Sequence, residues 1–379
     1  MTTNFPRFEG DYYGSFIFNP LNKIAEKGHD VTVIAPHFKP AASREVMGKV
    51  NVIRFNWPQQ EEFKPLMYFN WWECRRIPFL IASGLLEASK HIKRSKVDVI
   101  CAEGVLPMGF MAVVLGKVFR KPVVVTSHGV DLRSFYKKPF FSTILRFTLK
   151  NSSRIIAVSD ELKNYMLKLG IEEKDITIIP GGIDTQVFKP LEKKEEVFRV
   201  GFLGALNDFK NPENLLEAIP HLTVRIPKLE VLLAGDGPMR GFLESRAKKL
   251  GLSNKVRFLG FVDRQKVPGF LSEMDVMAFV SNRENFPSKA LFESMASGVA
   301  VVATDVGYTK SLVKHNTNGL LTKPEPKEIA KAIVELYENE ALRGECAKNA
   351  RKTIIDKYSL ESEVKTKIEI LRKVLEEVR

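Results

Sequence analysis

Residues 275–307, DVMAFVSNRENFPSKALFESMASGVAVVATDVG, predict a strand, a loop, a helix and a second strand. The apolar runs 276–280 and 299–303 have the length of strands. Pro287 can open the intervening helix and Gly298 can end it, because proline suits the first helical turn and glycine the left-handed position after the last. This order of elements predicts a parallel sheet.

Glu293 falls in the middle of that predicted helix and is its candidate functional residue. Its neighbours one turn away, Ala290, Ala296 and Ser297, have small side chains, so a ligand such as a ribose could approach the carboxylate closely. The alternative is a solvated glutamate paired with Lys289, four residues earlier.

The same alternation of strands and helices extends through the whole chain. Strand-like runs precede the opening stretch at 29–36, 51–55, 97–103, 122–131, 154–160, 198–206, 229–237 and 255–261. We therefore expect the α/β class with two doubly wound, Rossmann-like parallel-sheet domains, residues 1–190 and 191–359, joined by a charged linker at 191–196. Residues 360–379 predict an amphipathic helix that packs back on the first domain.

The start of the chain departs from this pattern. A loop with Gly10 and Gly14, followed by a helix that runs to Gly28, begins after only three residues. In an α/β fold such a loop follows a first strand, so the first strand is expected to be truncated. We predict that the native reading frame begins upstream by about five to six residues, the length of one strand.

Composition limits the classes of function. With 379 residues, 44% of them hydrophobic, the chain can form two cores. Lys+Arg 58 against Asp+Glu 45 gives a net charge of +13, which favours anionic partners such as nucleotides, lipid phosphates or nucleic acid. No supporting motif favours nucleic acid. The three cysteines, Cys74, Cys101 and Cys346, predict neither a disulfide framework nor a zinc site, and with a polar N-terminus they indicate a cytoplasmic protein.

Seven motifs, in order, carry a resemblance that covers nearly the whole chain: LNKIAEKGHDVTVIAP (21–36), VVTSHGVD (124–131), AVSDELKNYMLKLG (157–170), IIPGGIDTQVFKP (178–190), LLAGDGP (232–238), VRFLGF (256–261) and ESMASG (293–298). The chain resembles family 4 of the retaining glycosyltransferases, the glycosyl transferases group 1, with two domains facing a cleft in the GT-B architecture. The resemblance implies a UDP- or GDP-linked sugar donor held mainly by the second domain and an acceptor held by the first. It implies neither a metal nor another cofactor.

The resemblance also assigns roles in the first domain. Gly10 and Gly14 match the family's glycine-rich loop, whose backbone N–H groups face the donor diphosphate at a helix N-terminus. His128 matches the active-site histidine that contacts the reacting sugar or its phosphate. The alternatives are an ordinary turn for the glycines and a structural role for the histidine.

In the second domain, Gly204 and Lys210 match a motif in which two cations face the diphosphate. Lys210 keeps the cation that would stabilise the leaving group, whereas the other cationic position is Ala205. The turn of Gly235, Asp236 and Gly237 either contacts the donor or is structural.

The family's two acids lie eight positions apart, and Glu293 matches the second, the ligand of the ribose. Eight residues before it stands Asn285, whereas the nearest acid, Glu284, is nine residues before it. Either the loop carries one extra residue and Glu284 is the catalytic acid, with Asn285 as a donor contact, or the first acid is missing. The family has a donor-binding Gly-Gly pair followed by a glutamate. Here Gly307 matches the first glycine, Tyr308 stands at the second, and Ser311 stands at the position of the glutamate.

Two segments, 69–94 and 137–150, mix aromatic and basic side chains. Aromatic rings beside cations suit the headgroup region of an anionic membrane, so we expect a peripheral contact at the inner face of the cell membrane. The alternative is a buried amphipathic helix with a solvated basic rim.

The sequence therefore predicts a metal-independent, retaining hexosyltransferase that moves a sugar from a nucleotide sugar to a lipid-linked or other glycan acceptor. The main alternative is a degenerate relative that binds nucleotide or glycan as a non-enzymatic subunit, for which Ala205, Tyr308 and Ser311 argue. A sugar-nucleotide epimerase is a third possibility, which the order of the motifs disfavours.

Overall fold

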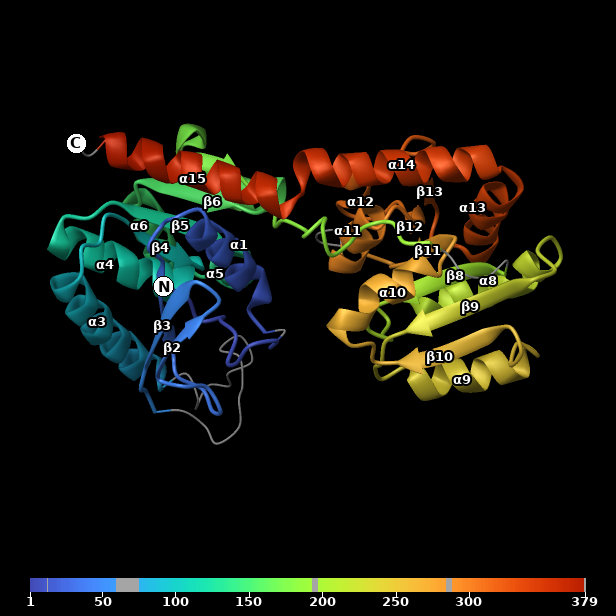
Figure 1. The fold of residues 1–379 in the computed structure, drawn as a ribbon, viewed down its shortest axis with the longest axis horizontal. Helices are drawn as coiled ribbons and strands as arrows, with labels where there is room; N and C mark the ends of the chain where they lie inside the picture. Colours follow the sequence, from blue (N-terminus) through green and yellow to red (C-terminus); the bar gives the residue numbers. More distant parts are fainter. Residues whose placement is uncertain (12, 59–74, 193–196, 284–287, 378–379) are drawn as a thin grey trace. The chain divides into compact units, whose positions relative to one another are not determined.

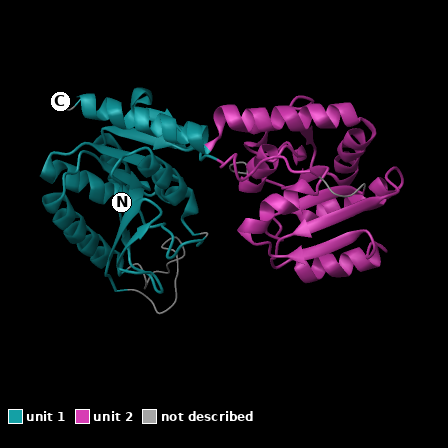
Figure 2. Ribbon diagram, viewed as in Figure 1, with its two compact units in different colours: residues 1–182, 360–379 teal, residues 183–359 magenta. Residues whose placement is uncertain are grey.

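The structure, a computed structural model, describes residues 1–11, 13–58, 75–192, 197–283 and 288–377. The chain forms two compact units, unit 1 from Met1–Gly182 with Leu360–Arg379, and unit 2 from Ile183–Ser359 (Figure 2). Each unit contains a sheet with helices on both of its faces (Figure 1).

Unit 2 contains a six-stranded parallel sheet in the order β10-β9-β8-β11-β12-β13. Its strands are β8 (Phe198–Leu203), β9 (Leu229–Ala234), β10 (Val256–Gly260), β11 (Val276–Phe279), β12 (Ala300–Thr304) and β13 (Leu320–Thr322). The chain adds strands outward from β8 in one direction and then outward from β11 in the other. The order of the strands therefore reverses between β8 and β11, which is where open α/β sheets bind their ligands.

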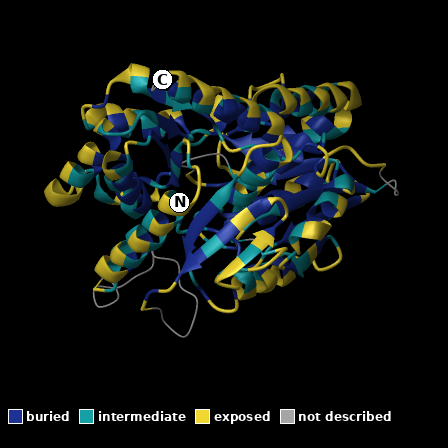
Figure 3. Cartoon of the chain, turned by 60° about the vertical axis from the view of Figure 1, so that its left-hand side comes forward, coloured by how far each residue is buried: buried dark blue, intermediate teal, exposed yellow. Residues whose placement is uncertain are grey.

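Helices cover both faces of this sheet, and the strands between them are buried (Figure 3). One face carries α8 (Pro212–Thr223), α9 (Arg240–Lys249) and α13 (Pro326–Glu338), and the other carries α10 (Val267–Ser272), α11 (Lys289–Ala296), α12 (Thr309–Leu312) and α14 (Glu340–Lys357). A short 3-10 helix, η4 (Arg264–Lys266), precedes α10. The strands are mostly apolar because both of their faces are covered, and the charged exceptions Arg199, Glu230 and Arg257 form ion pairs with one another.

The stretch 275–307 forms the predicted strand, helix and strand, namely β11, α11 and β12. The Ser288 side chain accepts a hydrogen bond from the N–H of Leu291 and so caps the start of α11. Gly298 ends the helix with φ +68°, the left-handed conformation expected of it. The predicted helix start at Pro287 lies outside the described residues.

Unit 1 contains the parallel sheet β4-β5-β6-β7 and the sheet β1-β3-β2, in which β2 is antiparallel to β3. The strands are β1 (Thr32–Pro36), β2 (Arg44–Met47), β3 (Val50–Phe55), β4 (Ile100–Glu103), β5 (Val123–Ser127), β6 (Arg154–Ala157) and β7 (Ile176–Ile178). The helices are α1 (Ser15–Glu26), α3 (Ile77–Arg94), η2 (Val105–Gly109), α4 (Phe110–Phe119), α5 (Val130–Phe135), α6 (Pro139–Lys150), α7 (Asp160–Lys168), η3 (Glu173–Asp175) and α15 (Leu360–Glu377). The larger core of unit 1 lies under α3, α4, α6 and α7, whereas α1 and α15 pack on the opposite face.

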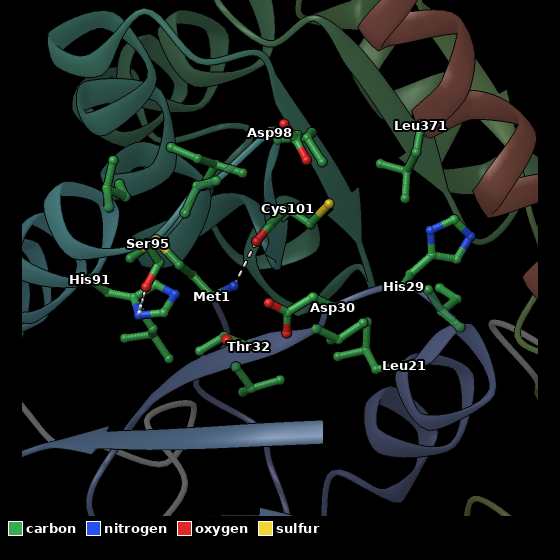
Figure 4. A pocket seen from close by; sticks show the side chains of 18 of the residues that line it. Met1, Leu21, His29, Asp30, Thr32, His91, Ser95, Asp98, Cys101 and Leu371 are labelled. Atoms are coloured by element: carbon green, nitrogen blue, oxygen red, sulfur yellow. Dashed lines mark hydrogen bonds between the residues drawn. The ribbon is translucent and has the colours of Figure 1, made fainter. Parts of the chain in front are cut away.

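The first two residues join the two sheets of unit 1. The N–H of Thr2 donates to the carbonyl of Ile34 in β1 at 3.1 Å, and the N–H of Glu103 in β4 donates to the carbonyl of Met1 at 2.9 Å. The α-amino group of Met1 donates to the carbonyl of Cys101 at 2.6 Å, beside a cavity of about 310 Å³ that β1, β4, α3 and α15 line (Figure 4). Burial lowers the pKa of this amino group. Whether residues precede Met1 in the natural protein stays a prediction.

The two units divide before the expected boundary at residue 190, because residues 183–188 pack on α14. Ile183 pairs with Ser359 and donates to the carbonyl of Tyr358, and the Arg351 guanidinium donates to the carbonyl of Phe188. The C-terminal helix α15 belongs to unit 1, where Val364 and Val374 are fully buried against α1 and β5.

Candidate active site

Four loops of unit 2 that carry predicted site residues lie at one edge of its sheet. These loops follow β8, β9, β11 and β12, and all four strands are parallel, so their carboxyl ends share that edge. The loops after β8 and β11 flank the reversal in strand order. A hydrogen bond of 2.8 Å from the Asn211 amide to Asn282 Oδ1 joins these two loops.

The glycines after β8 and β9 allow two loops to approach each other closely. A Cβ atom at Gly235 would lie 1.8 Å from the carbonyl oxygen of Gly204, and one at Gly237 would lie 2.4 Å from the carbonyl oxygen of Leu206. No other residue type fits at either position without displacing the backbone. A Cβ atom would fit at Gly204. The close approach therefore involves the backbone carbonyl of Gly204 and does not require a glycine there.

Asp236 lies at the tip of the second of these turns and is exposed. Its carboxylate accepts hydrogen bonds from the N–H of Gly237 at 2.8 Å and from the Arg240 guanidinium at 3.1 Å. These two hydrogen bonds lower the pKa of Asp236. The contacts hold the turn in shape, and they leave both interpretations of this aspartate open.

Two cations lie against one aromatic ring at the reversal point. Lys210 Nζ lies 5.4 Å from the centroid of the Phe209 ring, and the Arg283 guanidinium carbon lies 5.4 Å from the same centroid. Arg283 comes from the loop after β11, whereas Lys210 comes from the loop after β8. Ala205, which occupies the position of the family's second cation, is exposed in the same region. Arg283 therefore brings a second positive charge to the ring that Lys210 also contacts.

Glu293 lies on α11 and is only 2% exposed. Its carboxylate pairs with the Arg264 guanidinium, which also stacks on the Phe188 ring at 4.9 Å. Burial raises the pKa of Glu293, although Arg264 and Lys289 act in the opposite direction. Burial also lowers the pKa of Lys289 to about 8, and Arg264 adds to that shift.

The expectation of a solvated Glu293 is therefore wrong. The open face expected around it is wrong in part as well, because Ala296 and Ser297 are buried, and only Ala290 is partly accessible. The small side chains allow protein to pack closely on the helix. The role of Glu293 as the ligand of a ribose stays a prediction.

The remaining candidates of unit 2 are placed unequally. Glu284 and Asn285 lie outside the described residues. Gly307 follows β12 with φ +52°, and Tyr308 and Ser311 lie at the start of the short helix α12. The Ser311 hydroxyl donates to the carbonyl of Tyr308 at 2.6 Å. In this loop Gly307 and Tyr308 stand where the family has two glycines, and the Ser311 hydroxyl stands where it has a carboxylate.

In unit 1 the glycine-rich loop and the predicted active-site histidine lie close together. Gly14, with φ +74°, immediately precedes α1, and a Cβ atom there would lie 2.6 Å from the Cα of Phe5. Phe16, in the first turn of α1, meets the ring of His128 edge-on with 5.0 Å between centroids. Gly10 has φ +86° and open space around it. The structure thus brings Gly14 and His128 to one edge of unit 1, and Gly10 lies in an exposed turn.

His128 follows β5, and its Nε2 lies 2.7 Å from Oε2 of Glu103 at the end of the neighbouring strand β4. Lys367 of α15 lies 3.6 Å from the other carboxylate oxygen of Glu103 and 2.8 Å from Glu363. Burial acts to raise the pKa of Glu103, but Lys367 and His128 outweigh it and lower this pKa to about 2. Glu103 is therefore a carboxylate at neutral pH.

Sequence reasoning missed Glu103, Lys367, Arg264 and Arg283. Glu103 ends the strand-like run 97–103, and a carboxylate at the end of a strand was a signal for the site edge. The other three are charged residues on helices or loops, and their types alone do not distinguish them from solvated side chains.

The described residues contain no cluster of potential metal ligands and no helix that could span a membrane. Within the described residues no group of three or more His, Cys, Asp or Glu side chains could hold a metal ion. In the same part of the chain, no helix has the length and apolar character required to cross a bilayer. Residues 69–74 of the first basic aromatic segment lie outside the described residues.

The second basic aromatic segment forms α6, and its aromatic side chains are not buried. Phe140 is 71% exposed, and Phe141 and Phe147 are also exposed, whereas Leu145 and Leu149 pack inward. The inward Leu145 and Leu149 beside exposed Arg146 and Lys150 also fit an amphipathic helix with a solvated basic rim, so both interpretations of this segment stay open.

Comparison with known proteins places the chain in a family. The model of glycosyl transferases group 1 matches residues 184–353, and the model of glycosyltransferase family 4 matches residues 15–187. Together they cover most of the chain. The protein belongs to the group 1, family 4 type of glycosyltransferases, as its motifs indicated.

Individual relatives agree with this assignment. The chain is 25% identical to an uncharacterised glycosyltransferase of Methanocaldococcus jannaschii, over 93% of this chain and 92% of the relative. It is 23% identical to N-acetyl-alpha-D-glucosaminyl L-malate synthase of Bacillus anthracis, over 74% of this chain and 75% of that protein. HepE of Anabaena, solved in complex with UDP, has a TM-score of 0.70 at 21% identity, over 94% of this chain and 96% of HepE. The last comparison confirms the predicted fold class, two parallel-sheet α/β domains of the GT-B type.

Proposed function

We propose that this protein transfers a sugar from a UDP- or GDP-linked donor to a lipid-linked or other glycan acceptor, with retention and without a metal ion. The observation that carries the proposal is the pair of cations, Lys210 and Arg283, at the reversal point of the unit 2 sheet. The complex of HepE with UDP supports a nucleotide donor in a protein of this fold.

The donor would bind along the loops after β8, β9, β11 and β12. Gly235 and Gly237 have no side chains, so at these two turns a diphosphate could approach backbone N–H groups. Lys210 and Arg283 would stabilise the negative charge that grows as the diphosphate leaves. Fixed cations of this kind act most strongly in the transition state.

The ribose would bind at Glu293. A buried carboxylate with a raised pKa lacks solvation, and hydroxyl donors would supply hydrogen bonds that favour its charged form. Arg264 already pairs with one carboxylate oxygen, Oε1. The ribose hydroxyls would then donate to Oε2, so donor binding need not break the ion pair.

The chemical step would occur on the front face of the sugar. The bond from the anomeric carbon to the diphosphate oxygen breaks, the bond to the acceptor oxygen forms on the same face, and the acceptor proton passes to the leaving oxygen. This path uses no protein nucleophile. His128, in the unit that would bind the acceptor, would contact the reacting sugar or its phosphate.

We further propose that the acceptor is reached at a membrane surface, through α6. Phe140, Phe141 and Phe147 are exposed, and Lys138 lies 5.2 Å from the centroid of Phe135 beside them. Exposed aromatic rings bordered by lysines suit an interface with anionic headgroups. A lipid-linked acceptor would be presented at such a surface.

A panel of UDP- and GDP-linked sugars, assayed for release of free nucleoside diphosphate with and without membrane lipid extract, tests the proposal. Release that depends on the extract and resists EDTA is expected. Binding of nucleoside diphosphate without any release, by the parent and by Ala205→Arg alike, would instead establish the non-enzymatic binding subunit. Release that EDTA abolishes would overturn the metal-independent mechanism.

A further inference from the structure

Three buried charged side chains connect His128 to the C-terminal helix. Glu103 accepts from His128 Nε2 at 2.7 Å through one oxygen and faces Lys367 Nζ at 3.6 Å through the other. Lys367 also pairs with Glu363 at 2.8 Å, and Glu363 accepts from the N–H of Gly182 at 2.7 Å. Glu103, Lys367 and Glu363 are 7–8% exposed, so solvent screens these interactions little.

We propose that Glu103 and Lys367 are positioning residues that hold His128 in a single tautomer, with hydrogen on Nε2 and a lone pair on Nδ1 facing a sugar hydroxyl. This proposal rests on the proposed transferase function. Glu103 acts on the ring directly, and Lys367 acts by keeping Glu103 ionised.

The assignment of the tautomer follows from the charge of Glu103. An ionised carboxylate only accepts hydrogen bonds, so the nitrogen that faces it carries the hydrogen. In a neutral imidazole the other nitrogen, Nδ1, is then an acceptor. A hydroxyl of the sugar is a donor of the required kind, and a ring with the opposite tautomer would offer it no acceptor.

Lys367 acts against the effect of burial, which raises the pKa of Glu103 and favours its protonated form. Moving a carboxylate out of water disfavours its charged form, and Lys367 is the largest opposing influence, ahead of His128 and the Met1 amino group. A protonated Glu103 could donate to Nε2 and force hydrogen onto Nδ1. Through Lys367, the C-terminal helix therefore influences which ring nitrogen carries the hydrogen.

The neighbours of the ring restrict its orientation further. Phe16 meets His128 edge-on, and the backbone at Gly129 lies so close to Leu162 that a Cβ atom there would be 2.8 Å from its side chain. The buried carboxylate of Asp131, three residues after His128, accepts from the N–H groups of Val105 and Leu106 at 2.5 and 2.9 Å. These contacts fix the segment that carries the imidazole to the segment that follows Glu103.

Nitrogen-15 NMR of the histidine rings tests the tautomer without requiring any activity. The chain has six histidines, and the His128→Gln variant identifies the signals of His128 by their loss. At about pH 8.5, two units above the usual pKa of histidine, the parent should show hydrogen on Nε2 and a bare Nδ1. In Glu103→Ala and Lys367→Met the same ring should show the other tautomer or a mixture.

The matched control for Lys367→Met is Lys365→Met, an exposed lysine on the same helix, which should leave the His128 signals unchanged. The conservative variant Lys367→Arg should restore the parent pattern. A parent ring with hydrogen on Nδ1, or Glu103→Ala and Lys367→Met rings identical to the parent ring, would overturn the proposal.

Kinetics provide the second measurement, using the donor identified by the panel. Glu103→Ala should lower kcat by on the order of tenfold to a hundredfold, the usual scale for removing the partner that orients a functional histidine, with little change in KM for the donor. Tryptophan fluorescence serves as the folding control for unit 1, and nucleoside diphosphate affinity in unit 2 should not change. A variant that retains this affinity and the parent kcat contradicts the positioning role. A parent without turnover contradicts the proposed function alone, because the NMR result is independent of it.

Discussion

Unit 1 and unit 2 each bury a glutamate between cations, yet the two carboxylates respond in opposite directions. Burial acts to raise the pKa of both. For Glu103 the combined effect of Lys367, His128 and the Met1 amino group is larger, and the pKa falls to about 2. For Glu293 burial dominates Arg264 and Lys289, and the pKa rises.

The partners explain this difference. Lys367 is itself buried between two carboxylates, Glu103 and Glu363, which raise its pKa well above the usual value. In unit 2, Arg264 pairs with Glu293 and Lys289 acts on the same carboxylate electrostatically, while burial lowers the pKa of Lys289 to about 8. Unit 1 therefore uses its charges to hold protein atoms in place. Unit 2 contains a poorly solvated carboxylate, Glu293, and two cations, Lys210 and Arg283, with which a ligand could interact.

The largest expected effect separates these two uses of charge. Lys210→Ala should lower kcat by on the order of a hundredfold or more, the scale for losing one preorganised electrostatic contact, because Lys210 would face charge that grows as the diphosphate leaves. Its melting temperature should stay near that of the parent. Steady-state kinetics and thermal unfolding measure the two quantities.

Lys228, an exposed residue just before β9 at the opposite edge of the sheet, is the matched control, and Lys228→Ala should leave kcat unchanged. Arg283→Ser should also lower kcat, and adding Ala205→Arg should restore part of the loss. An Arg283→Ser variant with the parent kcat would show that the second cation comes from elsewhere.

The second effect concerns stability in acid. The folded pKa of Glu103 is about 2, below its ordinary value of about 4.5, so its stabilisation is present above about pH 4.5 and is lost as the pH falls towards 2. The shift corresponds to on the order of 3 kcal/mol. Trp57 is buried in unit 1, and no tryptophan falls within residues 183–359 of unit 2. Urea unfolding followed by tryptophan fluorescence therefore reports this unit.

Glu103→Gln should lower the free energy of unfolding at pH 7. Between pH 4.5 and 2 the free energy of unfolding should fall less steeply in this variant than in the parent. Glu293→Gln is the comparison in unit 2. Because the folded pKa of Glu293 is raised, the protonated carboxyl favours folding at low pH, and this contribution is lost as the pH rises through the folded pKa. Glu293→Gln should leave the pH dependence of unit 1 stability between pH 4.5 and 2 unchanged. If the free energy of unfolding falls equally steeply between pH 4.5 and 2 in the parent and in Glu103→Gln, the contrast between the two carboxylates is contradicted.

The sequence predicted the elements because their signals are local. The stretch 275–307 carries its own periodicity, and Gly298 is required at a left-handed position only a few residues from the helix it ends. The alternation of strands and helices predicted the parallel sheet of unit 2. Pairings such as Glu103 with Lys367 join residues far apart in the chain, and no local period encodes them. The same reason explains why the partner of Glu293 was expected in Lys289, four residues away, when Arg264 pairs with it as well.

The third effect concerns the proposed ribose site. If Glu293 holds ribose hydroxyls, it contributes equally in the ground state and the transition state, so Glu293→Ala should raise the Kd for nucleoside diphosphate by about tenfold to a hundredfold and leave kcat nearly unchanged. Calorimetric titration measures the affinity. Glu244→Ala, on the exposed face of α9, is the control and should not alter it. Unchanged affinity in Glu293→Ala would limit the carboxylate to pairing with Arg264.

The smallest effect tests whether the surfaces of the two units differ as their interiors do. Each unit exposes a phenylalanine on a helix, Phe140 on α6 and Phe242 on α9. Exposed lysines, Lys137 and Lys138, precede Phe140, and we expect only this surface to bind membranes. Phe140→Ser should reduce co-sedimentation with anionic vesicles by a few-fold, since burial of one aromatic ring contributes about 1.5–3 kcal/mol at most.

Phe242→Ser should have no effect on sedimentation, and the pair Lys137→Ser with Lys138→Ser should act like added salt, which screens the attraction between exposed charges. Neutral vesicles distinguish the contribution of the ring from that of the charges, because only the former persists on them. If Phe140→Ser and Phe242→Ser sediment alike, α6 is not the membrane surface. The lipid-linked acceptor would then lose its structural support, while the donor site of unit 2 would be unaffected, since none of its residues lies on α6.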